Sequence, residues 1–136
     1  MRTFLVIIFI SLTSLAETAP LRITITEGVI EPIPYAAPAF IGETGASNEI
    51  AVKITELIKS DLSGTGLFRE VPKSSYISSI DNFSSLVQYS DWKAINVQAL
   101  LTGSVLVTGE KISVKFRLFD VFSNNELGKG LQFNST

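Results

Sequence analysis

The sequence contains no cysteine and no histidine in its 136 residues. The absence of cysteine excludes disulfides, a thiolate nucleophile and a cysteine for lipid attachment. The absence of histidine removes the commonest general base and transition-metal ligand, and with it the usual form of a Ser-His-Asp triad. A zinc site would need carboxylates alone, which zinc rarely accepts. Together these absences argue against an enzyme and against a metal or any other cofactor.

The first 16 residues have the pattern of a secretory signal peptide. Arg2 supplies the positive charge, residues 4–15 form an apolar run, and Ser14 and Ala16 make a small-x-small cleavage site. The apolar run of 12 residues is short for a membrane span, although an uncleaved N-terminal anchor remains the alternative. We therefore expect cleavage after Ala16 and a mature chain of 120 residues that begins at Glu17.

Clustered positive charge is also missing. Without Arg2 the mature chain has 10 Lys and Arg residues against 13 Asp and Glu residues, which gives a net charge of −3. Affinity for nucleic acid comes mostly from clustered Lys and Arg, and the chain has no basic tract. The composition therefore argues against a nucleic-acid partner.

Two glycines, Gly64 and Gly66, raise the question of a phosphate-binding loop in the stretch SDLSGTGLF. A phosphate cradle places its glycines before a helix, where N–H groups and the positive end of the dipole face the anion. Here the glycines follow the strongest helical pattern in the chain, residues 47–64, and lie at its negative end. We interpret Gly64 as the left-handed residue that ends this helix, so no nucleotide site is predicted.

The 47–64 segment predicts an amphipathic helix. Ser47 or Asn48 can cap its start, and Glu49 and Lys53 have the spacing of an ion pair. Asp61 falls on the apolar face, where it needs donors such as the N–H groups of the following loop. A catalytic acid is the alternative interpretation of Asp61, but no partner base is visible. The predicted apolar face consists of Ile50, Ile54, Leu57, Ile58 and Leu62.

Alternating apolar residues predict strands on both sides of this helix. Prolines at positions 32, 34 and 38 place the 33–41 segment at a sheet edge or in an extended stretch. A serine-rich surface connection over 73–90 precedes a short helix over 90–96, which turns Trp92 and Ile95 inward. Trp92 is interpreted as a core residue, with an anchor for a ligand or partner as the alternative. The predicted strands are 21–26, 33–41, 67–71, 98–107, 111–118 and 127–134.

This order of elements predicts an α/β (α+β) fold: a mixed β-sheet of about five strands with two helices packed on one face. The second strand of the last hairpin has a polar face with a basic row, Lys111, Lys115 and Arg117. This row is either a solvated face or a contact for an acidic partner. No internal repeat and no coiled-coil pattern is present.

Four blocks of the sequence together resemble the N-terminal domain of the TolB family, which belongs to the Tol–Pal envelope system. They occur in the family's order and spacing over residues 21–133, and they read LRITITEGVIEPIPYAAPAFIG, DLSGTGLF, DWKAINVQALLTGSV and KFRLFDVFSNNELGKGLQF. The resemblance implies a periplasmic, non-enzymatic α/β domain over 32–136, without a cofactor or small-molecule substrate. In the family a six-bladed β-propeller follows this domain and holds Pal. No propeller follows Thr136 here, so we expect a fragment or a lone domain that does not bind Pal through a propeller.

The resemblance also implies a function for the mature N-terminus, residues 17–31. In the family this segment is an arm that docks on the periplasmic domain of TolA, in a system that maintains the outer membrane, constricts it at cell division and is used by colicins for import. An alternating segment at a free terminus can add as a strand to a partner's sheet, although 21–26 as an internal strand is the alternative. The predicted TolA-binding residues are Glu17, Thr18, Ala19, Pro20, Leu21, Arg22, Ile23, Thr24, Ile25, Thr26, Glu27, Gly28, Val29, Ile30 and Glu31.

Two other functions stay open. The first is a stand-alone domain of this fold that regulates an envelope enzyme. The second is a small-ligand binder or an enzyme, against which the lack of His, Cys and any carboxylate pair argues. Asp61 and Asp120 are the only acids predicted in apolar surroundings, and contacts at a helix end or strand end explain them.

Overall fold

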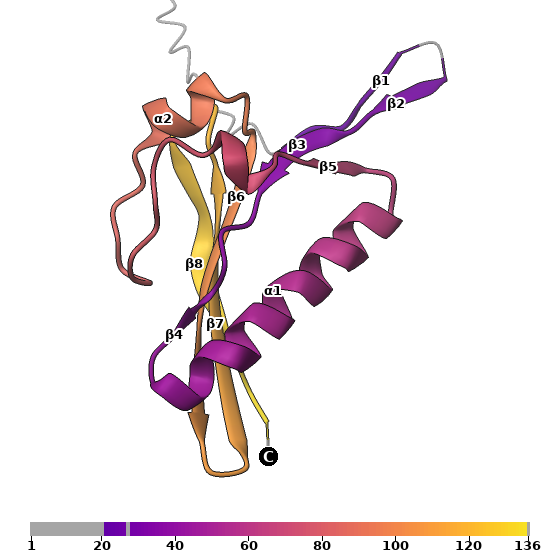
Figure 1. Cartoon of the computed structure of the whole chain (residues 1–136). Helices are drawn as coiled ribbons and strands as arrows, with labels where there is room; N and C mark the ends of the chain where they lie inside the picture. Colours follow the sequence, from indigo (N-terminus) through magenta and orange to yellow (C-terminus); the bar gives the residue numbers. More distant parts are fainter. Residues whose placement is uncertain (1–20, 27, 136) are drawn as a thin grey trace, which may run out of the picture.

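A computed structural model describes residues 21–26 and 28–135, so the predicted signal peptide 1–16 and the first arm residues 17–20 lie outside the described range (Figure 1). The fold combines two helices with a mixed sheet, which confirms the predicted α/β class. The elements are β1 (Thr24–Thr26), β2 (Val29–Glu31), β3 (Ile33–Ala36), β4 (Ile41–Gly42), α1 (Gly45–Gly64), β5 (Phe68–Glu70), a 3-10 turn (Lys73–Ser75), α2 (Tyr89–Ala94), β6 (Ala99–Thr108), β7 (Lys111–Asp120) and β8 (Asn125–Asn134).

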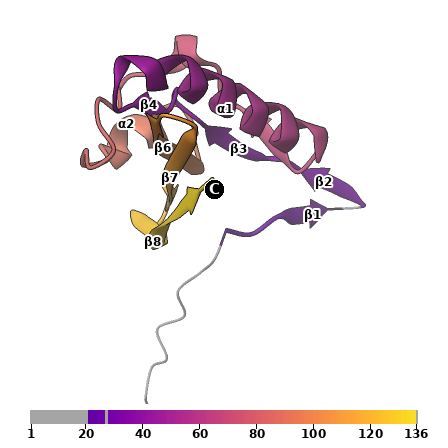
Figure 2. The same cartoon turned by 90° about the horizontal axis from the view of Figure 1, so that it is seen from below.

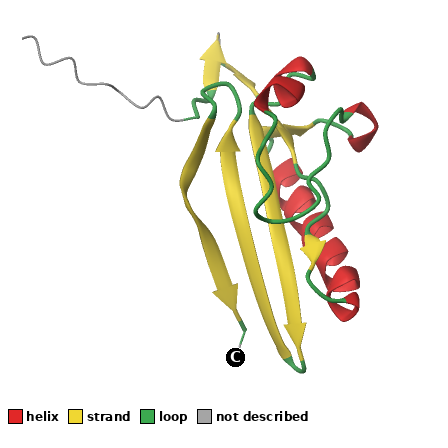
Figure 3. Cartoon of the chain, turned by 90° about the vertical axis from the view of Figure 1, so that its left-hand side faces the viewer, coloured by secondary structure: helices red, strands yellow, loops and turns green. Residues whose placement is uncertain are grey.

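The main sheet has the strand order β5-β3-β6-β7-β8, and β4 pairs with β6 further along. β3 is parallel to both β5 and β6, whereas β6, β7 and β8 form an antiparallel meander. The long β6–β7 hairpin pairs without interruption from Ala99 opposite Asp120 to Thr108 opposite Lys111. Figure 3 shows these three long strands side by side, so the predicted C-terminal hairpin is confirmed and extended by β8.

The two helices pack on opposite faces of the sheet, not on one face as predicted. Side chains alternate between the faces along a strand. In β6, Leu101 and Val105 belong to apolar clusters with α1, whereas Leu100 packs with Trp92 of α2 and with Phe119 of β7. In Figure 1, α1 accordingly crosses the lower part of β6 and β7 and runs up to the right, whereas α2 with the connection before it lies to the left. The buried position of Trp92 confirms its interpretation as a core residue.

The predicted 33–41 strand is broken into β3 and β4, and β3 is not at the sheet edge. β3 lies between β5 and β6 although it contains Pro34. The carbonyl of Pro34 accepts a hydrogen bond of 2.8 Å from the N–H of Gln98, so the missing N–H of the proline faces the same side. Because β6 starts only at Ala99, no ladder bond is lost there. β3 therefore tolerates Pro34 inside the sheet because β6 begins only after the point where the N–H of residue 34 would be needed.

α1 begins at Gly45, two residues before the predicted start, and Ser47 is not its cap. Ser47 is fully buried, and its Oγ accepts a 2.9 Å hydrogen bond from the N–H of Val107 in β6. The buried face is centred on the small side chains of Ser47, Ala51 and Thr55. Leu57 was wrongly assigned to this face, since its side chain is 62% exposed. The larger residues that do pack on the sheet are Ile50, Ile54, Ile58 and Leu62.

The glycine loop ends α1 as predicted, but the left-handed residue is Gly66 and not Gly64. Gly64 is still helical, Thr65 is right-handed with φ −75°, and Gly66 has φ +69°. Thr65 Oγ1 donates to the carbonyl of Leu62 at 2.7 Å and accepts from the N–H of Leu67 at 3.1 Å. These hydrogen bonds hold Thr65 in place, so the left-handed residue that reverses the chain is Gly66, the next residue.

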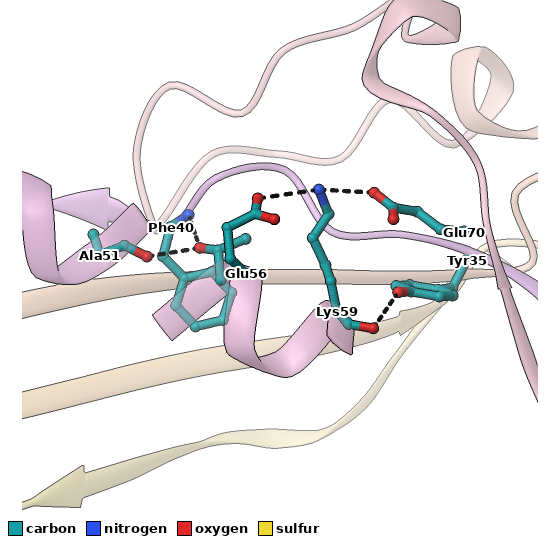
Figure 4. A network of polar contacts seen from close by, with 7 residues as sticks. Tyr35, Phe40, Ala51, Glu56, Lys59 and Glu70 are labelled. Atoms are coloured by element: carbon teal, nitrogen blue, oxygen red, sulfur yellow. Dashed lines mark hydrogen bonds and ion pairs between the residues drawn. The ribbon is translucent and has the colours of Figure 1, made fainter. Parts of the chain in front are cut away.

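A set of polar contacts fixes α1 against β3 and β5 (Figure 4). Thr55 Oγ1 accepts the N–H of Phe40 and donates to the carbonyl of Ala51, both at 2.8 Å. One turn later, Lys59 Nζ lies 2.7 Å from Glu70 Oε1 of β5, and this bond raises the pKa of Lys59. The buried hydroxyl thus satisfies a backbone donor in the break between β3 and β4.

Candidate functional site

The predicted TolA-binding segment contains a hairpin that projects from the domain. β1 pairs antiparallel with β2, and Ile25 lies opposite Ile30. Gly28, in the turn, has φ +79°, a conformation that only glycine adopts without strain. β1 and β2 form a two-stranded sheet separate from the main one, and Figure 2 shows them extending away from it. We call residues 21–31 the arm; Glu27 of this segment and the predicted site residues 17–20 lie outside the described residues.

The arm exposes an apolar face. Ile23, Ile25 and Ile30 share one side of the hairpin, because Ile25 and Ile30 are directly opposed and Ile23 is two residues before Ile25. The exposed fraction is 65% for Ile25, and Val29 on the other side is also exposed. A two-stranded hairpin is at best marginally stable alone, and a cross-strand contact such as that of Ile25 with Ile30 adds little to its stability. This arrangement is typical of a surface that a partner covers.

Leu21 attaches the base of the arm to the domain. Its side chain is half-buried and packs beside Leu62 of α1, Phe68 of β5 and Leu118 of β7. Together these residues line an apolar cavity of about 240 Å³ between α1 and the sheet. On the far side of the arm Arg22 and Glu31 border a smaller polar hollow. Apolar contacts of Leu21 therefore hold the base of the arm against the domain.

The basic row predicted on β7 is not a free cationic surface. Arg117 donates from Nε and Nη2 to the two carboxylate oxygens of Glu126, both at 2.9 Å, and from Nη1 to the carbonyl of Phe83 at 3.0 Å. This pairing lowers the pKa of Glu126 and raises that of Arg117. The guanidinium also lies 4.8 Å from the centre of the Phe119 ring. Lys115 Nζ lies 3.7 Å from a carboxylate oxygen of Glu43, just before α1. Of the three residues of the row, Lys111 alone is exposed and has no ion partner among the described residues.

Neither acid singled out in the sequence forms a catalytic site. Asp61 is exposed, because it lies on the flank of α1 and not on its buried face. The loop N–H groups expected to bind it instead donate to Leu62, Ser63 and Thr65. Asp120 is buried at the end of β7 and accepts the N–H of Ser123 at 3.3 Å, as expected for a strand-end contact.

Across the described part of the chain, no group of three or more Asp and Glu side chains is arranged to hold a metal ion. No helix in residues 21–26 and 28–135 is long and apolar enough to cross a membrane. The geometry of the described residues thus offers surfaces for binding and no cluster of chemically reactive groups.

The fold and the arm define a class of protein: an α/β domain that presents an amphipathic hairpin next to its N-terminus. The family described as the TolB amino-terminal domain matches residues 21–127. Since this match covers most of the chain, the chain belongs to the family of TolB amino-terminal domains.

Curated relatives agree with this assignment. A Tol-Pal system protein TolB from Cereibacter sphaeroides is 58% identical over 118 residues, which are 87% of this chain and 27% of the relative. Another, from Roseobacter denitrificans, is 54% identical over 120 residues, 88% of this chain and 27% of the relative. The chain thus spans about a quarter of the length of these relatives.

Solved structures show the same fold at low sequence identity. TolB from Acinetobacter baumannii superposes with a TM-score of 0.60 at 22% identity, over 77% of this chain and 23% of that one. The C-terminal domain of LpoB from Escherichia coli has a TM-score of 0.57 at 16% identity, over 82% of this chain and 87% of that one. At these identities the likeness concerns the fold alone.

Proposed function

We propose that this chain is a periplasmic adaptor domain of the Tol–Pal system, and that residues 17–31 bind the periplasmic domain of TolA. The observation that carries the proposal is the exposed row of Ile23, Ile25 and Ile30 on a hairpin separate from the main sheet. Family membership and the Tol-Pal names of the relatives support the choice of system. The adaptor is not an enzyme, and it contributes to outer-membrane integrity and to envelope constriction at division.

Binding proceeds by strand addition. The outer edges of β1 and β2 pair with no other described strand, so their backbone groups are available to a partner's sheet edge. The isoleucines fill apolar pockets of the partner, while Thr24 and Glu31 on the opposite side stay in water. Pal, which the family holds through its propeller, is not expected to bind through this domain; colicin import is a use of the family's system as a whole.

The test is a calorimetric and NMR titration of the chain from Glu17 with the periplasmic domain of TolA. Shifts should concentrate in the arm. Ile25→Lys should weaken binding at least tenfold, because a charge would enter an apolar pocket of the partner. Thr24→Lys, the neighbouring residue on the polar side, is the matched control and should retain affinity. Both variants should unfold at the same urea concentration as the parent chain. Shifts outside the arm, or equal losses in both variants, would reject the assignment.

A further inference from the structure

A bulge in the middle of β8 places Lys129 beside Arg117. Leu127 and Leu131 keep their pairing with β7, whereas residues 128–130 between them lie opposite Arg117 alone. In a regular strand Lys129 would point to the same face as Leu127 and Leu131, because each lies two residues away. Lys129 instead lines a hollow on the other face of the sheet, together with Arg117.

Two glycines make this bulge possible. Gly128 and Gly130 have φ +73° and +75°, in the left-handed region that residues with a side chain enter only at a cost. A Cβ at Gly130 would also lie 3.2 Å from the carbonyl oxygen of Phe116. Bulges re-aim side chains, and they are over-represented next to active sites. The bulge therefore brings Lys129 to a position that regular alternation would not allow.

The hollow beside Lys129 combines a positive charge with an aromatic wall. It has a volume of about 300 Å³, and its lining residues are Phe83, Ser84, Arg117, Glu126 and Lys129. Arg117 and Glu126 form an ion pair, so their charges cancel. Lys129 forms no ion pair with any described residue. The hollow therefore carries a single net positive charge.

Arg117 supplies a second donor to the hollow. A guanidinium has five N–H groups. Four of them have partners: Nε and Nη2 each donate once to Glu126, and Nη1 donates to the carbonyls of Phe83 and Ser85. The second N–H of Nη2 has no partner among the described residues. Because the Arg117 side chain is still 21% exposed, this N–H group is available to a ligand.

We propose that the hollow binds the carboxylate group of a small organic anion. The ammonium of Lys129 and the free N–H of Arg117 bind the carboxylate oxygens through charge-assisted hydrogen bonds, and the apolar part of the ligand lies on the ring of Phe83. A carboxylate fits better than a phosphate dianion, because Glu126 would repel a second negative charge. No residue of the arm lines the hollow, so this site is independent of the proposed contact with TolA.

The test is an NMR titration of the isotope-labelled chain from Glu17 with phenylacetate, which joins a carboxylate to an aromatic ring. We expect saturable shifts at residues 83–86 and 126–130, and weaker binding at high salt. Phenylacetamide has the same shape without the charge, and it should bind about tenfold more weakly. Inorganic phosphate should also bind more weakly than phenylacetate, since it carries no apolar part and more negative charge.

Matched lysine variants localise the contact. Lys129→Gln should weaken phenylacetate binding about tenfold, because the ligand loses its charged donor. Lys111→Gln is the control: it removes the same charge from an exposed lysine that does not line the hollow, and it should retain affinity. Both variants should unfold at the same urea concentration as the parent chain. Absence of saturable shifts at the hollow, equal losses in both variants, or equal binding of phenylacetamide or phosphate would overturn the proposal.

Discussion

β1 of the arm and β6 of the main sheet are both strands with apolar side chains, but their environments are opposite. β6 is apolar at consecutive positions, 99–101 and 105–107, and its Val105 is fully buried, whereas Ile25 of β1 lies between two threonines and is 65% exposed. β6 has a paired strand on each side and a helix on each face, while β1 pairs only with β2. An apolar side chain in a strand is therefore not enough to predict its burial, because the elements that pack on the strand decide whether the side chain is buried.

The difference separates residues that stabilise the fold from residues that are available for binding. Removal of a buried side chain leaves a cavity, whereas removal of an exposed one leaves the folded domain unchanged. Substitution of the exposed apolar residues of the arm should therefore leave stability unchanged, and under the proposed function it should affect association. The predictions below test this division, from the largest expected effect to the smallest.

The largest effect is expected from a pair of truncations, one in each region. Leu100→Ala should lower the free energy of unfolding by about 2–5 kcal/mol, because Leu100 is fully buried between Trp92 and Phe119. Ile25→Ala should lower it by less than about 0.5 kcal/mol. Urea unfolding followed by the fluorescence of Trp92, the only tryptophan, measures both. A large loss in Ile25→Ala would show that the arm is part of the core.

The contrast between the arm and the main sheet also shows which parts of the fold could be predicted from the sequence. Most of the succession of strands and helices along the chain followed from periodicity and from glycine and proline, because these signals are local, although β2 was not predicted. Placement of the helices on opposite faces could not be predicted, because it depends on which of Leu100 and Leu101 faces α1, and both are leucines. The assignment of Leu57 to the core failed for a related reason: small residues such as Ser47 and Thr55, and not the large ones, centre the buried face.

Recognition of the candidate site depended on the family pattern and not on chemistry. The alternation of 21–26 was compatible with an internal strand as well as with an arm, and only the structure separates the hairpin from the sheet. The role of Arg117 was missed because its partners, Phe83 and Glu126, come from segments 34 residues before it and 9 residues after it. No local signal encodes such a contact.

Loss of the Arg117 hydrogen bonds should release a segment that is now held against the main sheet. The connection between β5 and α2 is irregular, and Arg117 fixes it to β7 and β8 through the carbonyls of Phe83 and Ser85 and through Glu126. Arg117→Met should cost about 1–2 kcal/mol of stability. It should also make the connection sensitive to chymotrypsin at Phe83 and Leu86, before the rest of the domain unfolds. Unchanged proteolysis would mean that packing alone holds the connection.

Substitution of two left-handed glycines, one in each region, compares the effect of backbone strain on the domain and on the arm. Gly66, at the end of α1, and Gly28, in the arm, have φ +69° and +79°. Alanine in this conformation costs about 1 kcal/mol, so Gly66→Ala should lower the melting temperature of the domain. Gly28→Ala should strain only the hairpin and leave global unfolding unchanged. Gly64→Ala is the control and should be neutral or stabilising, since Gly64 is helical and meets open space. Equal losses at Gly64 and Gly66 would contradict the observed end of α1.

The smallest effect is expected in the stability of the domain at low pH. The hydrogen bonds from Arg117 lower the pKa of Glu126 below its ordinary value of 4.5. Because the folded state binds this proton more weakly than the unfolded state, the stabilisation is complete above the unfolded pKa and is lost as the pH falls through the folded pKa. Glu126→Gln should therefore reduce stability at pH 7 and flatten the loss of stability below about pH 4.5. Glu31→Gln is the control, because no ion pair of the described residues involves the arm, and it should leave the acid limb unchanged. If Glu31→Gln flattened the limb as much as Glu126→Gln, the arm would have to contribute to the stability of the fold, and the division between the two regions would fail.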